Sequence, residues 1–214
     1  MLHAVDQGGE YFSLIRSKPS KKAIHYWRVQ MKHLKSYIRF FDYMADGKWT
    51  IIMNEDYKEL YTHAWTYRNL QIGEKYFTSY KLFIDSCYED LVQRIHKKKK
   101  KEKKAFRKQL EIVDPDTKNL HNQINTFFRR HTKGSLIEGW KGYKESMVHK
   151  IKKIQKQKHV KCKKLHKMRK HTKDLLYLHK LFGISEEFYQ ELVGWTQLLW
   201  RWNDRYEMIW LLYE

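Results

Sequence analysis

Two segments of this chain, residues 23–41 and 164–182, align with each other without a gap. The matching basic positions pair His25 with His166, Arg28 with Arg169 and Lys32 with Lys173. Steps of three and four residues place such side chains on one side of a helix, beside a neighbouring apolar stripe. The repeat therefore predicts a duplicated helical unit whose cationic face binds something anionic.

The composition favours a packed all-α protein. Apolar residues make up 42% of the 214 residues and aromatic residues 15%, which is enough for a core and excludes a disordered chain. Only 2 Pro and 9 Gly interrupt the sequence. Helix formers dominate long stretches without a two-residue alternation, so we expect helices throughout.

Seven segments have a helical pattern, and local signals mark some of their ends. Ser20 is a plausible N-cap for the first segment, and Asp46-Gly47 follows it. Pro115 lies near the midpoint and marks the expected joint between two bundles, residues 1–113 and 114–214. The expected helices span residues 20–44, 55–70, 71–111, 117–132, 137–160, 161–183 and 186–212.

A second pair of short motifs supports the duplication. Arg68-Asn69 and Asn203-Asp204 each follow one of the two His-x-x-Arg helices, and aromatic residues and leucines flank both. The separations differ by a few residues, which surface connections tolerate. We expect these side chains to cap helices, to form hydrogen bonds or to orient arginines.

The net charge of +20 indicates a polyanionic partner, because a globular monomer has no structural reason to accumulate such self-repulsion. Acids are absent from residues 21–41, and the expected helix there is long enough to meet several phosphates. Arginine offers paired N–H donors and lysine a mobile point charge, a mixture suited to phosphate oxygens. The candidate ligands are His25, Arg28, Lys32, Lys35 and Arg39 in the first copy and His166, Arg169, Lys170 and Lys173 in the second. The alternative is an ordinary solvated basic face.

Residues 94–108 form a second basic block, with one Glu among its lysines and arginines. Such a block is either a long helix with one basic face or a solvated, partly frayed segment that adds only long-range attraction. Residues 141–173 are also basic, but Tyr143, Met147 and Ile151 offer a packing stripe. We expect this second region to belong to the folded cationic surface.

Metal binding and catalysis find little support in the sequence. The 12 His lack an HExxH or a paired His/Cys pattern, and nearby lysines repel divalent cations, so we expect no metal and no cofactor. There is no Gly-rich phosphate loop and no G-x-S-x-G motif, so we expect no catalytic residue. His25 and His166 are better suited to donate hydrogen bonds to phosphate.

Cysteine use and hydropathy indicate a cytoplasmic protein. Cys87 and Cys162 have no C-x-x-C spacing, as expected for buried or inert thiols in a reducing compartment. The N-terminus has no continuous apolar core, so it does not resemble a signal peptide. The apolar segment 195–214 carries charges at helical spacing, which favours a core helix over a membrane anchor.

These motifs together resemble a known family. The string HYWRVQMKHLK, which begins at His25 and is followed by Arg39-Phe40-Phe41, resembles the opening motif of the CHAD family, the conserved histidine α-helical domain. The string LHKMRKHTKDLLYL, which contains His166 and Tyr177, is similar to the motif of that family's second half. Arg68-Asn69-Leu70 and Asn203-Asp204 lie where the family has its Arg-Asp and Asn-Asp elements. The resemblance extends from about residue 20 to the end.

The resemblance implies a standalone CHAD domain. Its expected fold is two four-helix bundles related by a pseudo-twofold, with a basic groove or pore, and its expected function is to bind inorganic polyphosphate without hydrolysing it. The resemblance also implies that Arg68 contacts the polyphosphate from a neighbouring helix. It further implies that the protein associates with polyphosphate granules in the cytoplasm. A nucleic-acid-binding protein is the first alternative, because aromatic residues stack on bases. A phosphohydrolase or phosphotransferase that uses His25 or His166 is the second.

Three positions depart from the family pattern. Asn69 replaces the usual Asp, His33 replaces a common Arg, and Leu176 occupies a position where a basic residue commonly precedes the tyrosine. Leu176 aligns with Lys35 of the first copy, so the second copy lacks one expected phosphate contact. We therefore predict that the first copy binds more strongly than the second.

Overall fold

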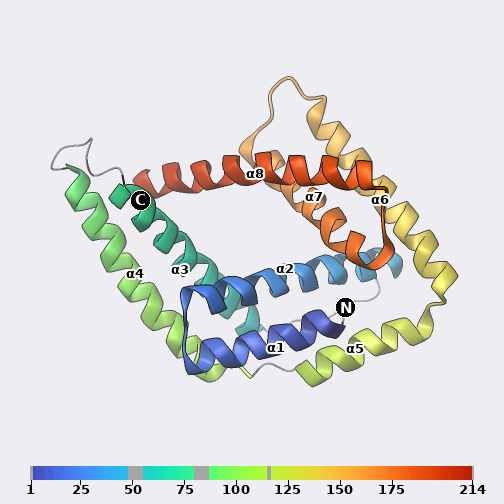
Figure 1. Ribbon diagram of the computed structural model, residues 1–214, viewed down its shortest axis with the longest axis horizontal. Coiled ribbons are helices and arrows are strands. Elements are labelled where there is room, and N and C mark those ends of the chain that lie inside the picture. Colours follow the sequence, from blue (N-terminus) through green and yellow to red (C-terminus); the bar gives the residue numbers. More distant parts are fainter. Residues whose placement is uncertain (1, 48–54, 80–86, 115–116, 214) are drawn as a thin grey trace. The chain divides into compact units, whose positions relative to one another are not determined.

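The computed structural model describes residues 2–47, 55–79, 87–114 and 117–213 of the chain. Every regular element in these ranges is an α-helix, which confirms the predicted all-α fold class (Figure 1). The helices are α1 (Leu2–Ser17), α2 (Lys21–Met44), α3 (Glu55–Ser79), α4 (Cys87–Ile112), α5 (Thr117–Arg130), α6 (Lys133–Gln155), α7 (Cys162–Phe182) and α8 (Glu186–Tyr213).

The ends of α2 follow the local signals in the sequence. The Ser20 hydroxyl accepts a hydrogen bond from the Ala23 N–H at 3.1 Å, so Ser20 is the predicted N-cap. Beyond the last turn, Asp46 and Gly47 adopt positive φ values of 47° and 72°. Glycine tolerates this conformation and Asp is one of the few other residues that visit it, so the pair ends the helix.

Helix α1 was not predicted, because Gly8 and Gly9 weaken the helical pattern of its sequence. Packing explains both the helix and one of its glycines. Phe12 and Ile15 on α1 are fully buried, and a Cβ on Gly8 would lie 3.1 Å from Met31 Cε. Burial of the apolar face therefore outweighs the low helix propensity of the glycines.

The predicted break between residues 70 and 71 is wrong, because α3 continues to Ser79. Leu70, Gln71 and Phe77 are all buried, so packing continues past the expected boundary. Gly73 adds a close approach, since a Cβ there would lie 2.6 Å from Leu211 Cδ1.

The basic block 94–108 lies within α4, which matches the first of its two predicted alternatives, a long helix with one basic face. A few buried apolar residues are sufficient to anchor this helix. Ile95, Phe106 and Leu110 are buried, while most lysines of the block lie on the exposed side. The helix is thus anchored by one face and carries its charge on the other.

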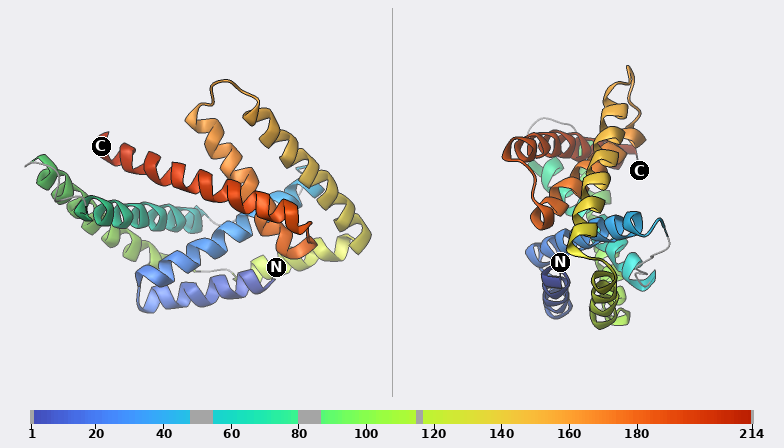
Figure 2. Two further views of the ribbon diagram at one scale, coloured as in Figure 1. Left: turned by 45° about the horizontal axis from the view of Figure 1, so that its top comes forward. Right: turned by 90° about the vertical axis from the view of Figure 1, so that its right-hand side faces the viewer.

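The contacts divide the chain into two compact units, each drawing on both sequence halves. Unit 1 contains Met1–Val5, Lys32–Ile51 and Lys118–Arg205, and unit 2 contains Asp6–Met31, Ile52–Thr117 and Tyr206–Glu214. Helices α3 and α4 pack side by side within unit 2, and α6 and α7 form a helical hairpin within unit 1 (Figure 2). The predicted division into residues 1–113 and 114–214, and the predicted pseudo-twofold, stay predictions.

Aromatic residues fill the core of unit 1. The ring centroids of Phe41 and Phe127 are 4.0 Å apart, and Phe40 and Phe182 meet at 5.1 Å. The end of α2 also approaches α6 closely, because a Cβ on Gly139 would overlap Met44. Truncating a buried phenylalanine costs about 3–5 kcal/mol of folding free energy, so these rings hold α2, α5 and α7 in place.

Unit 2 has a core of its own. Phe12, Trp27 and Tyr57 pack together, and the Trp27 indole N–H donates a hydrogen bond of 3.4 Å to the Tyr57 hydroxyl. Burial raises the pKa of Tyr57 to about 12. A second cluster joins α3, α4 and the end of α8 through Leu70, Ile95, Phe77, Leu91, Met208 and Leu211. Within the part of the chain that is described, no helix is long and apolar enough to span a membrane.

Candidate anion-binding site

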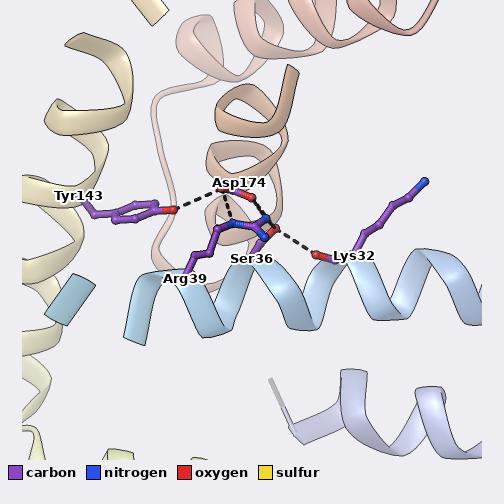
Figure 3. Close-up of polar contacts among 5 residues, drawn as sticks. All are labelled: Lys32, Ser36, Arg39, Tyr143 and Asp174. Carbon is purple, nitrogen blue, oxygen red and sulfur yellow. Dashed lines mark hydrogen bonds and ion pairs between the residues drawn. The ribbon is translucent and has the colours of Figure 1, made fainter. Parts of the chain in front are cut away.

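A buried carboxylate joins α2 to α7 in unit 1. Asp174 of α7 is almost fully buried, and Arg39 of α2 donates to both of its oxygens, from Nε to Oδ2 at 2.8 Å and from Nη2 to Oδ1. The Ser36 hydroxyl lies 2.7 Å from Oδ1 (Figure 3). A bidentate Arg–carboxylate pair of this kind fixes the position of both partners.

The third partner of Asp174 comes from α6. The Tyr143 hydroxyl donates to Asp174 Oδ2 at 3.4 Å. Burial, followed by the charge of Asp174, raises the pKa of Tyr143, so this hydroxyl remains a donor at neutral pH. Asp174 is therefore the point at which α2, α6 and α7 are held together.

Two basic side chains of α7 lie close to this anchor. Burial lowers the pKa of Lys170, the Arg39 charge lowers it further, and Asp174 opposes both effects. Burial also lowers the pKa of His171, with Lys150 among the cations that act in the same direction. Arg39 and Lys170 are therefore two cations close to one carboxylate, that of Asp174.

A second carboxylate lies among the remaining cations. Burial raises the pKa of Asp204 on α8, and the charges of Arg169, Lys173 and Lys32 act in the opposite direction. The four side chains are therefore close enough to interact, although they come from three helices. Figure 3 shows the Lys32 side chain extending from α2 on the side where α7 lies.

His166 stands at the beginning of the same row on α7. Its ring meets the Trp202 ring edge-on, with the centroids 5.0 Å apart. Burial lowers the pKa of His166, and the neighbouring Arg169 lowers it further. The imidazole is therefore mainly neutral at pH 7, and in that state one ring nitrogen still donates a hydrogen bond.

We call five of the lysines and arginines described above, together with the carboxylates of Asp174 and Asp204, the α2–α7 cluster. Five cations oppose two carboxylates, so the cluster keeps an excess of positive charge. Partial burial reduces the screening of that charge by solvent. The arrangement suits an anion with several charges spread along its length. Its members are Lys32, Arg39, Arg169, Lys170, Lys173, Asp174 and Asp204.

Seven of the ten residues predicted to bind an anion lie in unit 1, and all seven are on α2 and α7. Six of these, namely Lys32, Arg39, His166, Arg169, Lys170 and Lys173, are connected by the contacts and electrostatic effects described above. Lys35 is half-buried on the same helix as Lys32. The phosphate contact assigned to each residue stays a prediction, and for Arg39 the bond to Asp174 is an additional role.

The other three predicted residues lie in unit 2. His25 is exposed at the start of α2, whereas Arg28, one turn later, is buried. Arg68 on α3 is half-buried and donates to Gln71 Oε1 at 3.4 Å. Its neighbour Asn69 donates to Glu207 Oε2 at 3.1 Å, which is the kind of hydrogen bond predicted for this motif.

Sequence reasoning missed Asp174, Ser36 and Tyr143 as parts of the site. Tyr143 was assigned to a packing stripe, which is correct but incomplete. One signal was present, because Asp174 is the sole acid between Glu145 and Glu186 in a strongly basic region. An isolated acid in such a region is a candidate for a buried partner of an arginine.

The described residues contain no group of three or more His, Cys, Asp or Glu side chains placed to hold a metal ion. Cys162 is a free, exposed thiol at the start of α7. The side chains of the cluster offer positive charge and hydrogen-bond donors.

Comparisons with known proteins identify the family. No curated protein matches this chain. A solved structure, the crystal structure of the CHAD domain from the plant Ricinus communis, matches with a TM-score of 0.72 at 15% sequence identity, over 95% of this chain and 72% of that one. At this identity the likeness concerns the fold. The family model of the CHAD domain matches residues 3–199, and the chain therefore belongs to the CHAD domain family.

Proposed function

We propose that this chain binds inorganic polyphosphate at the α2–α7 cluster and does not hydrolyse it. The observation that supports this most is the gathering of Lys32, Arg169 and Lys173 around one half-buried carboxylate, Asp204. Cations that gather in this way attract the charged oxygens of a phosphate chain.

The Asp174 anchor makes the cluster suitable for a flexible polymer. Because Arg39, Ser36 and Tyr143 are already fixed by Asp174, the nearby lysines project from helices that are held in position. Binding then costs less conformational entropy than it would on a mobile surface. The bound polymer also releases condensed counterions, as polyanions do when lysine and arginine neutralise them.

The proposal includes the residues that were predicted from the repeat. Lys32, Lys35, Arg169 and Lys173 contact phosphate oxygens directly, and His166 donates a hydrogen bond. Arg39 and Lys170 also belong to the proposal, whereas the contacts predicted for His25, Arg28 and Arg68 of unit 2 stay predictions. We further propose that the chain acts in the cytoplasm and associates there with polyphosphate granules.

Titration with long-chain polyphosphate at several salt concentrations tests the binding. With about five phosphates neutralised, the logarithm of the affinity should fall with the logarithm of salt concentration with a slope of roughly −3 to −5. No binding at low salt would overturn the proposal.

Competition with single-stranded RNA distinguishes the first alternative. At one ionic strength, and at equal concentrations of phosphate groups, polyphosphate should displace bound RNA. Displacement in the opposite sense would identify the chain as a nucleic-acid-binding protein. Phosphate release from polyphosphate, measured with and without a divalent metal, distinguishes the enzyme alternative, and we expect none.

A further inference from the structure

Unit 2 contains a pocket that the proposed function does not use. It lies among α3, α4 and the last turns of α8, and its volume is about 210 Å³. Leu70 and Leu211 form an apolar floor, and both are buried members of the core cluster of this unit. The floor is therefore part of the folded core, and the pocket does not depend on a loop for its shape.

The pocket has one aromatic wall and one cationic wall. Trp65 of α3 lines it and keeps 37% of its surface exposed. Lys98 and Lys101 of α4 line it from the basic block, and their spacing of three residues places them on one face of the helix. These two lysines therefore line the pocket in addition to adding to the charge of the block.

Two carboxylates complete the lining. Glu102 Oε1 lies 2.5 Å from His63 Nδ1, and Glu207 Oε2 accepts a hydrogen bond from Asn69 at 3.1 Å. These contacts hold each carboxylate against the wall. A carboxylate accepts several hydrogen bonds, so both groups also suit a ligand that carries N–H or O–H donors.

We propose that this pocket binds a nucleoside monophosphate. The planar base stacks on Trp65 above the apolar floor, and the phosphate contacts Lys98 and Lys101. Amino or hydroxyl donors of the nucleoside face Glu102 and Glu207.

Other ligand classes fit this lining less well. An aliphatic acid has no donor for Glu102 or Glu207, so it would desolvate both carboxylates without compensation. Polyphosphate alone has no apolar ring for Trp65 and no amino or ribose donors for the two carboxylates. A ring with donors and one phosphate satisfies all the walls together. The residues that line this pocket are different from those of the α2–α7 cluster.

Calorimetric titration of the full chain tests the proposal, with AMP, adenosine and inorganic phosphate as separate probes. AMP should bind at least about tenfold more tightly than either fragment, because only AMP reaches the aromatic and the cationic walls together. Phosphate binding as tightly as AMP would show that the ring contributes nothing. That result would overturn the proposal.

Three variants locate the site. W65A should weaken AMP binding about 5- to 150-fold, the range for loss of one base–aromatic stack, and W65F should restore most of it. K98A/K101A should also weaken AMP binding, while leaving that of adenosine unchanged. The matched control is K97A/K100A, which removes two exposed lysines of α4 that do not line the pocket and should leave AMP binding unchanged.

One further variant separates this proposal from the proposed function. R169E/K173E should reduce polyphosphate binding and leave AMP binding intact. If R169E/K173E abolishes AMP binding while W65A does not affect it, AMP binds at the α2–α7 cluster and the pocket proposal is wrong. If the wild-type chain does not bind polyphosphate, the AMP titration still tests the pocket proposal, because the two proposals concern different residues.

Discussion

The α2–α7 cluster in unit 1 and the basic block of α4 in unit 2 are both rich in lysine and arginine, but they hold their charge differently. In the cluster, the almost fully buried Asp174 fixes Arg39, and the half-buried Asp204 lies among three cations. In the block, most lysines are exposed, and partly accessible Glu74 accepts from Lys99 and His96. Composition alone does not separate the two regions. The almost complete burial of Asp174 does, since Asp204 and Glu74 are both only partly buried.

This difference assigns the regions different roles. Charges fixed by buried partners present a defined geometry to a ligand, whereas exposed lysines supply attraction that salt screens. Under the proposed function, we expect the cluster to determine where polyphosphate binds and the outer face of α4 mainly to increase the rate of encounter.

Removing the buried carboxylate should have the largest effect. D174A leaves Arg39 without its bidentate partner and removes the acceptor for Ser36 and Tyr143. We expect the free energy of unfolding to fall by about 3 kcal/mol, as for other disrupted buried ion pairs. Urea denaturation measures it.

The matched control for D174A is E55A, which removes one partner of the exposed Glu55–Lys58 pair on α3. Exposed pairs contribute little, so E55A should have no measurable effect on unfolding. Equal losses for D174A and E55A would show that Asp174 is not an anchor.

Acid should destabilise the region around the cluster through His33. Burial, with a further contribution from Lys180, lowers the pKa of this histidine to about 4, and its ring stacks on Tyr177 at 4.1 Å. The unfolded chain takes up a proton near pH 6.5 and the folded chain does not. Stability is therefore lost as pH falls from about 6.5 to 4, by on the order of 2 kcal/mol.

H33F tests this pH dependence. Phenylalanine keeps the stack on Tyr177 and removes the titrating group, so the free energy of unfolding should vary less between pH 6.5 and 4. H96F is the control from the basic block, because His96 is nearly half exposed. If H33F and H96F have the same pH profile as the wild type, the burial of His33 has no energetic consequence.

Glu74 of α3 is the acidic partner of the basic block and in this sense the counterpart of Asp174. Its partial burial raises the pKa, but hydrogen bonds from Lys99 and His96 outweigh burial and lower the pKa overall. Because 22% of the Glu74 side-chain surface is exposed, water replaces part of the interaction with Lys99 and His96 that E74A removes. We expect a loss of about 1 kcal/mol in unfolding free energy, clearly less than for D174A. A loss as large as that of D174A would remove the distinction between the regions.

The smallest effect concerns the asymmetry between the two copies of the repeat. Leu176 continues the row of Arg169 and Lys173 by one turn of α7, so L176K adds a cation to the cluster. We expect polyphosphate affinity to rise about two- to threefold, as for one screened charge. L181K adds the same charge elsewhere on α7 and should have less effect. An unchanged affinity for L176K would contradict the proposed asymmetry.

Local patterns predicted much of the fold and many members of the cluster. The cap at Ser20, the three-four spacing of Arg169 and Lys173, and the helical character of most segments are properties of neighbouring residues. The sequence pattern did not predict helix α1, because Gly8 lowers helix propensity. The compensating contact with Met31 is distant in sequence. Asp174 was not predicted as part of the site for the same reason, since its partners Arg39 and Ser36 lie far from it along the chain.

The predicted helix boundary at residue 70, which lies inside α3, is wrong for the same reason. Nothing local marks residue 70 as the interior of a helix, and the burial of Leu70 and Phe77 depends on packing with α4 and α8. Spacing along the chain predicts which side chains share a face. It does not predict which distant residue that face will meet.

The most direct test compares two double charge reversals with the same change in net charge. K32E/R169E alters the α2–α7 cluster, and K97E/K100E alters exposed lysines on the outer face of α4. Thermal unfolding of both variants establishes that each is folded, and K32A/R169A replaces the first variant if it is not.

Polyphosphate affinity at physiological salt is the deciding measurement. We predict that K32E/R169E weakens binding about 100-fold and that K97E/K100E weakens it less than about threefold, because only the first removes fixed phosphate contacts. Equal losses in the two variants would show that overall charge, and not the α2–α7 cluster, binds the polymer, and would contradict the account.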